Sequence, residues 1–209
     1  MYLKKLLVLS VVAMAGCVSG SYHTATPIPS GAVELGIAAG VVAQTRQEQV
    51  YDDLINTSDG TFLMYDLFLR YGVNSWSDLG LQFNIFGALA GSLRADYNVN
   101  LINTDSFALS IAPALQLLGS TGGGAERISG DLGLFFDVYK SQSTIFSLNL
   151  KPGYEYFSES VSLGSGVLLH HRIAEGWFLA PFVDVYMKPG QKNYAFELYG
   201  GIGLVYRIL

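Results

Sequence analysis

The sequence predicts an all-β fold, a single antiparallel up-and-down transmembrane β-barrel of about ten strands, with eight or twelve strands as the alternatives. Three observations predict it. From Ala32 onward, apolar residues alternate with polar or small residues at a period of two. Most of the alternating runs are ten to fourteen residues long, whereas strands of soluble proteins average about 5–6 residues. Half of the 209 residues are hydrophobic and only 14% are charged, against about 25% in an ordinary soluble domain.

Residues 1–16 have the parts of a secretory signal peptide. Lys4 and Lys5 form a charged start, and residues 6–15 form a short apolar core that ends in small residues. The sequence Met-Ala-Gly-Cys that ends at Cys17 resembles the lipobox of bacterial lipoproteins. This resemblance implies that Cys17 is acylated and becomes the first residue of the mature chain. The alternative is an ordinary signal peptide followed by a cysteine of no special role.

Residues 17–31 are predicted to be the acylated cysteine followed by a flexible tether. The stretch is small, polar and proline-containing, and it shows no strand periodicity. Val18 follows the cysteine, which in lipoproteins of this type favours the outer membrane over the inner. His23 lies within the tether and has no evident partner.

Residues 32–209 are predicted to form the barrel. In the first five strands, residues of one parity are apolar, while the other parity carries polar, charged or small residues. The strands, with residues that show the alternation, are 32–43 (Val33, Leu35, Ile37), 62–73 (Leu67, Leu69, Tyr71), 76–86 (Leu79, Leu81, Phe83), 89–99 (Leu93, Ala95, Tyr97) and 107–118 (with Ser110, Ala112 and Gln116 on the quieter face).

The second five strands follow the same rule. They are 128–139 (Leu132, Leu134, Phe136 outward), 144–157 (Ser147, Asn149, Lys151 inward), 161–172 (Ser162, Gly164, Gly166 inward), 177–187, and 194–208 (Phe196, Leu198, Leu204 outward). We expect Leu67, Leu81, Phe83, Leu134 and Leu204 to face lipid, and Arg70, Gln82, Asp131 and Glu197 to face the lumen.

The lengths of the connections indicate which end of the barrel faces outward. Bacterial barrels have short periplasmic turns and longer outer loops. The two longest connections fall on the same side, which is the outer side if the chain starts in the periplasm. Both termini are then periplasmic. The outer connections are 44–61, 87–88, 119–127, 158–160 and 188–193, and the periplasmic ones are 74–75, 100–106, 140–143 and 173–176.

Aromatic residues fit this orientation. Trp76 and Trp177 each follow a periplasmic turn, where interfacial aromatic girdles belong. Tyr194 and Tyr206 lie twelve residues apart on the outward face of the last strand. At about 3.3 Å per residue and a tilt of about 45°, that separation is roughly 28 Å, close to the apolar band of about 25 Å.

The hairpin from Arg70 to Leu81, with sequence RYGVNSWSDLGL, resembles one found in bacterial outer-membrane β-barrel proteins with a lipoprotein-type signal peptide. The passage from Thr24 to Glu34 is also similar to those proteins. The resemblance implies an architecture, with outer-membrane lipids, the barrel-assembly machinery and the lipoprotein-sorting machinery as partners. The chain departs from the pattern at its end, because such barrels usually finish on an outward-facing aromatic residue, and this one ends in Leu209.

The inward face collects charged residues, with acids in excess over bases. One interpretation is a structural network of ion pairs that fills a small lumen, because buried charges must be paired. The other is a cation-favouring path or polar ligand site, although ten strands enclose little water-filled width. The predicted network comprises Glu34, Asp66, Arg70, Asp78, Arg94, Asp96, Asp131, Asp137, Lys151, Glu155, Glu197 and Arg207.

The sequence predicts no catalytic residues, no metal site and no cofactor. Of the tandem His170 and His171, only His170 is expected to point inward, at the periplasmic end near Arg172, a cation that cannot accept a proton. The glycines at 122–124 lack the Lys-Ser/Thr of a phosphate-binding loop. The net charge of −5 and the lack of a basic patch exclude nucleic acid as a partner.

These features predict a non-enzymatic, porin-like lipoprotein of the Gram-negative outer membrane that is structural, adhesive or a narrow cation-favouring conduit. A first alternative is a soluble periplasmic lipoprotein with a lipocalin-like ligand-binding calyx, in which the apolar face would point inward. The scarcity of charge argues against the polar exterior that a calyx needs. A second alternative is a lipid-acting barrel enzyme of the outer membrane.

Overall fold

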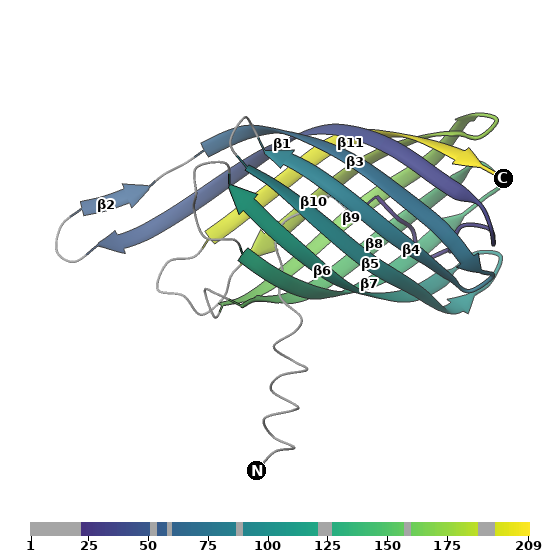
Figure 1. Ribbon diagram of the computed structural model, residues 1–209, viewed down its shortest axis with the longest axis horizontal. Helices are drawn as coiled ribbons and strands as arrows, with labels where there is room; N and C mark the ends of the chain where they lie inside the picture. Colours follow the sequence, from purple (N-terminus) through teal and green to yellow (C-terminus); the bar gives the residue numbers. More distant parts are fainter. Residues whose placement is uncertain are drawn as a thin grey trace, which may run out of the picture.

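Ten long strands wind into a closed barrel in the computed structural model, and an eleventh short strand extends one of its hairpins (Figure 1). The structure describes residues 22–50, 54–57, 60–86, 90–120, 127–156, 160–187 and 195–209. The strands are β1 (Val33–Val50), β2 (Leu54–Thr57), β3 (Gly60–Asn74), β4 (Ser77–Phe86), β5 (Ala90–Asn103), β6 (Ala108–Ser120), β7 (Arg127–Lys140), β8 (Thr144–Glu155), β9 (Ser160–Ala174), β10 (Trp177–Met187) and β11 (Ala195–Ile208).

Each barrel strand pairs antiparallel with its neighbours in the sequence, and β1 closes the cylinder. Val33 of β1 is opposite Tyr71 of β3 on one side and opposite Ile208 of β11 on the other. Closure gives the backbone groups of both terminal strands hydrogen-bond partners, which a sheet edge in a bilayer would lack. Among the described residues, no helix is long and apolar enough to cross a membrane.

The observed barrel confirms the predicted fold class and strand number, and each predicted strand overlaps one observed strand. The interpretation of residues 44–61 as a loop was wrong in part. β1 continues to Val50, and its end pairs with β2 in the register Gln47 to Thr57 and Val50 to Leu54. The hairpin projects beyond the barrel rim (Figure 1), because β-branched residues in both segments favour the extended backbone and the pairing simply continues.

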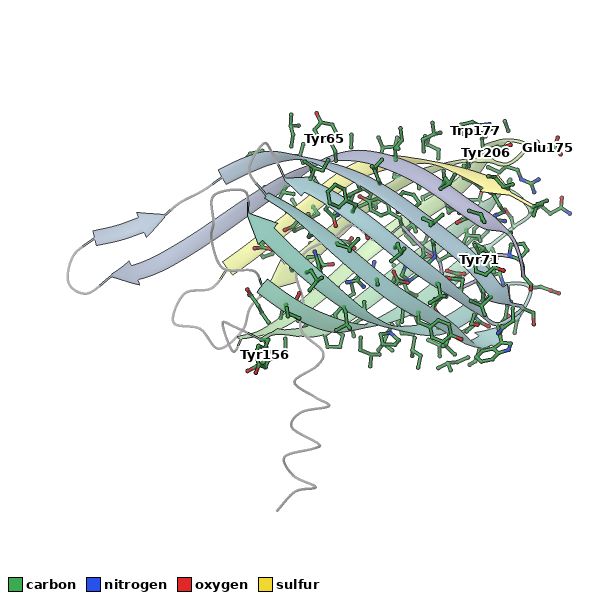
Figure 2. All side chains as sticks on the ribbon, in the orientation of Figure 1. Tyr65, Tyr71, Tyr156, Glu175, Trp177 and Tyr206 are labelled. Atoms are coloured by element: carbon green, nitrogen blue, oxygen red, sulfur yellow. The ribbon has the colours of Figure 1, made fainter. Side chains whose placement is uncertain are left out.

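The apolar faces of the strands point outward. Leu67, Leu81 and Phe83 are 53%, 48% and 44% exposed, and Leu134 and Leu204 lie on the same face with partial exposure. Side chains project from the ribbon all around the cylinder in Figure 2. Such a continuous apolar exterior is stable against lipid and not against water. It is the reverse of a calyx, which hides its apolar face inside.

The four short connections 75–76, 104–107, 141–143 and 175–176 lie at the same end of the barrel as the C-terminus (Figure 1). We call this the turn end and the opposite end the loop end. Trp76 lies in the first of these turns, and Trp177 begins β10 with its ring 4.7 Å from that of Tyr206. Figure 2 shows this pair at the turn end and Tyr156 toward the loop end. The fourth predicted interfacial aromatic, Tyr194, lies outside the described residues.

Candidate functional site in the barrel lumen

The chain preceding β1 lies inside the barrel. Residues 22–32, which we call the lumen segment, run from the turn end into the lumen, and Tyr22, Ala25, Ile28 and Ala32 are buried. Ala25 packs against Ala108, Ala112 and Phe135. The expectation that residues 17–31 form a flexible tether is therefore wrong for the described part, from residue 22 onward, because the barrel wall supplies specific partners for it.

A glycine pair fixes the point where the lumen segment leaves β1. The Gly31 amide donates to the Gly72 carbonyl at 2.8 Å, and the Gly72 amide donates to the Ala32 carbonyl at 3.0 Å. Gly31 has φ of 80°, which favours glycine. At Gly72 a Cβ would lie 2.1 Å from the Pro29 carbonyl oxygen, so only glycine lets the segment approach β3 this closely.

Tyr22 anchors the inner end of the lumen segment by aromatic contacts. Its ring stacks on Phe68 of β3, with centroids 4.7 Å apart and an interplanar angle of 4°, and meets the ring of Phe182 from β10 edge-on at 4.8 Å. The Tyr22 hydroxyl donates to Asp66, which also accepts from the Asn84 amide. The phenol thus adds a donor to the second oxygen of this buried carboxylate.

Asp137 of β7 binds the middle of the lumen segment. It is fully buried and accepts from the Ala25 amide at 2.8 Å, from the Thr26 amide at 2.7 Å and from the Thr26 hydroxyl at 2.6 Å. The Ser147 hydroxyl adds a fourth bond at 2.5 Å. Nearer the turn end, the Asn100 side-chain amide donates to the Ala25 carbonyl at 2.9 Å. Hydrogen bonds to a charged acceptor are roughly twice as strong as neutral ones, so Asp137 is the principal polar anchor.

The rest of the lumen is crossed by buried ion pairs. Arg70 donates to Asp78 through Nε at 3.0 Å and lies 3.0 Å from Asp96. Arg94 forms a fork with Asp131, with one bond of 2.9 Å. These pairs join β3 to β4 and β5, and β5 to β7, across the interior. Bidentate pairing of this kind compensates the large desolvation cost of burying guanidinium and carboxylate groups.

Two further cations complete the network. Lys151 lies 3.7 Å from Asp184 and donates to the Tyr186 hydroxyl at 2.9 Å. At the turn end, Arg207 donates to Glu34 at 2.7 Å, which joins β11 to β1 where the barrel closes. The Arg207 side chain is 24% exposed, so this pair is the one most open to water among those described.

A small polar recess with a cavity volume of about 10 Å³, enough for about one water molecule, lies beside the lumen segment toward the turn end. Arg207 and His170 share the ring of Phe178 there, at 4.8 Å and 4.4 Å. Arg172, the residue expected beside His170, is exposed and donates to the Gln142 carbonyl. The recess is lined by Tyr22, His23, Thr24, Thr26, Ile28, Glu34, Arg70, Asp78, His170 and Arg207.

All twelve residues of the predicted charge network point inward. Ten are buried, and Glu197 and Arg207 are partly exposed at the two ends of β11. Sequence reasoning missed the contribution of Tyr22, His23 and Thr26, although two aromatic rings in an otherwise small and polar stretch were a usable signal. Cys17 lies outside the described residues. No group of three or more His, Cys, Asp or Glu side chains suited to a metal occurs in the described part of the chain.

The described lumen carries nine carboxylates and four Lys or Arg side chains. In addition to Asp96, four of these carboxylates each form an ion pair with a Lys or Arg side chain. Asp66 and Asp137 instead accept from neutral donors, and the lumen segment supplies Tyr22 to the first and Ala25 and Thr26 to the second. The segment therefore supplies donors to two acids that form no ion pair within the part of the chain that the structure describes.

Comparison with known proteins supports the architecture. No protein family model matches the chain, and no curated protein matches it. Its fold is similar to the crystal structure of the outer membrane protease OmpT from Escherichia coli, with a TM-score of 0.59 and 8% identity over 92% of this chain and 99% of that one. The COG4313 outer membrane channel from Pseudomonas putida F1 gives a TM-score of 0.48 and 12% identity, over 92% and 100%. The first likeness shows a shared outer-membrane barrel fold.

Proposed function

We propose that the chain is a non-enzymatic, narrow, cation-favouring conduit of the Gram-negative outer membrane, closed when the lumen segment is docked. The observation that carries the proposal is the excess of carboxylates over Lys and Arg in the described lumen. A low-dielectric wall concentrates the field of this excess of acidic over basic side chains and so favours cations over anions. A ten-strand cylinder admits only small solutes.

The histidines support a role without catalysis. A barrel hydrolase needs a nucleophile, a base beside it and space for substrate. Thr144 Oγ1 lies 2.8 Å from His171 Nδ1, but this pair is exposed on the outer wall at the turn end. His170 is buried against Phe178 and has no hydrogen bond to a hydroxyl among the described residues. The likeness to a protease concerns the fold alone.

The turn end fits the periplasmic side of the membrane. It carries the short connections, both tryptophans and the C-terminus, whereas the β1–β2 hairpin projects from the loop end (Figure 1). This arrangement agrees with barrels whose longer loops face outward. Outer-membrane lipids and the barrel-assembly machinery are then the partners of the wall.

We expect the undocked barrel to conduct cations in preference to anions. The purified Gly72→Val variant, in which the lumen segment is expelled as argued in the Discussion, should give a reversal potential of cationic sign in a KCl gradient. Asp137→Asn added to that variant should reduce the preference about twofold, because one lumen carboxylate is lost. Leu81→Ala, which changes only the lipid face, is the matched control. Anion preference, or no current from an undocked barrel, would contradict the conduit.

A lipid anchor at Cys17 is part of the proposal, and it would act on the lumen segment. Asp66, which binds Tyr22, lies eight residues from Asn74 at the turn end, or about 19 Å along a barrel axis tilted by about 45°. The five residues from Cys17 to Tyr22 reach at most about 18 Å. The two lengths are nearly equal, so an anchor in the periplasmic leaflet would hold the chain between Cys17 and docked Tyr22 almost fully extended.

The mature N-terminus is expected to be an acylated Cys17, because the residues before it resemble a lipobox. Mass spectrometry of the protein purified from membranes should find a diacyl or triacyl modification, and Cys17→Ser should abolish it. An unmodified terminus at a later residue would leave an ordinary exported barrel. Because the chain between an anchored Cys17 and docked Tyr22 is short, Cys17→Ser should also raise the fraction of protein in which the segment is docked.

A further inference from the structure

We propose that the lumen segment is an acid-released plug, and that protonation of His23 drives it out of the barrel. Opening of the conduit by this release rests on the proposed function. The release itself does not, because it concerns only where residues 22–32 lie, and it can be measured without any current.

His23 is held in the lumen as a neutral ring. Its imidazole lies against Phe135 of β7, with centroids 3.9 Å apart and an interplanar angle of 45°. Its Nε2 is buried and has no hydrogen-bond partner among the described residues. The His23 residue is half-buried, but a protonated ring would still place the N–H at its buried Nε2 without an acceptor among the described residues.

The charges that face His23 come from three strands. Arg70 of β3, Arg94 of β5 and Lys151 of β8 are cationic, and Asp96 of β5 is the one acid with a comparable influence. The nearby carboxylates of β7 are engaged, Asp131 by Arg94 and Asp137 by the segment itself. Burial, together with the positive charge of Arg70, holds the pKa of the His23 imidazole well below its usual value of 6.5, and Asp96 opposes this effect.

The recess adjoining His23 adds other titratable groups. Glu34 and Arg207 form an ion pair there, Asp78 is paired with Arg70, and His170 lies against Phe178. His170 is thus the second histidine that acid could charge near the segment. Any test must separate its titration from that of His23.

The composition of the lumen segment suits it for release. Residues 22–32 contain no Asp, Glu, Lys or Arg, so the docked segment is held by neutral donors and aromatic contacts, without a salt bridge. His23 is its only side chain that titrates near neutral pH. The segment joins β1 at the turn end, where Gly31 is hydrogen-bonded to Gly72 of β3. It can turn about this point and leave the lumen while β1 stays paired with β11.

The sign of the pH effect follows from these charges. Docked His23 has a lowered pKa and undocked His23 titrates near 6.5, so the undocked state binds more protons between those values. Docking is therefore fully stable above about pH 6.5 and weakens as the pH falls below it. The ratio of docked to undocked segment should fall up to about tenfold for each pH unit in this range.

Thiol labelling tests the release directly. In a Cys17→Ser background, a cysteine replaces Thr24 inside the lumen, and in a second protein a cysteine replaces the exposed Ser30 as a control for the pH dependence of the reagent. Between pH 7.5 and pH 5.5, we expect the labelling rate at position 24, relative to position 30, to rise about fivefold to tenfold, because only one pH unit of this range lies below the pKa of the undocked imidazole. With His23→Phe, which keeps an aromatic ring against Phe135, the ratio should stay within about twofold.

His170→Phe serves as the matched variant and should retain the full rise. A rise that survives in His23→Phe, no rise with His23 present, or loss of the rise in His170→Phe would each overturn the proposal. Heat-modifiable mobility on a gel reports folding of every variant, and His23→Leu replaces the phenylalanine variant if that one fails to fold. Labelling that rises without any current would refute the conduit and leave the acid-released plug intact.

Discussion

Replacing Arg70 with leucine is expected to prevent most of the protein from reaching the folded barrel. Arg70 is buried and is the cation shared by Asp78 and Asp96, which are buried as well. Its loss leaves two carboxylates without their counter-ion, and removal of one partner from a buried pair typically costs 3–5 kcal/mol. That is a large share of the roughly 5–15 kcal/mol by which whole domains are stable.

Refolding into lipid vesicles, read by heat-modifiable mobility and by urea titration, measures this effect. Leu69→Ala is the matched control, because it changes the neighbouring residue on the lipid face. A triple variant, Arg70→Gln with Asp78→Asn and Asp96→Asn, removes all three charges and should recover part of the lost stability. If Arg70→Leu unfolds at the same urea concentration as the native sequence, the ion pairs do not hold the lumen together.

Gly72→Val is expected to expel the lumen segment at every pH while the barrel stays folded. The new Cβ would lie 2.1 Å from the Pro29 carbonyl oxygen and 2.9 Å from that of Ile28. Both contacts are with backbone, which cannot rotate away as a side chain would. Valine itself suits an extended strand, so the damage falls on the segment and not on β3.

The cysteine at position 24 reports the result. Its labelling at pH 7.5 should rise at least tenfold in Gly72→Val, and the rate should no longer depend on His23. Gly200→Val is the control, since the nearest atom to its new Cβ is Val183 Cγ2 at 4.0 Å. A cysteine that stays protected in Gly72→Val would mean that the segment is held by contacts deeper in the lumen and that the glycine pair does not control docking.

The two variants test separately the ion pairs of the barrel wall and the docking of the lumen segment. Arg70 belongs to the wall, whose charges are paired across strands. Gly72 belongs to the place where the segment passes β3. We therefore expect loss of the barrel from the first substitution and an emptied barrel from the second, and only the second can show what the lumen conducts.

Much of the fold could be predicted from the sequence because a β-strand encodes its two faces locally. The parity that places Leu67 outward also places Arg70 inward, whatever the distant partners are. Connection lengths then order the strands, since neighbours joined by short turns must pair antiparallel. Among the strands, the β1–β2 hairpin was misjudged, because alternation does not show how far pairing continues beyond the membrane.

The sequence by itself determined which side chains of the strands point into the lumen, and the tertiary structure decided what each one meets there. Arg94 and Asp131 are 37 residues apart, and their pairing depends on the curvature and register that close β1 against β11. The lumen segment shows the limit most clearly, since a short polar stretch with prolines has no periodicity to read. It docks because inward alanines of β6 leave room for it, and because Asp66 and Asp137, which form no ion pair among the described residues, bind its donors.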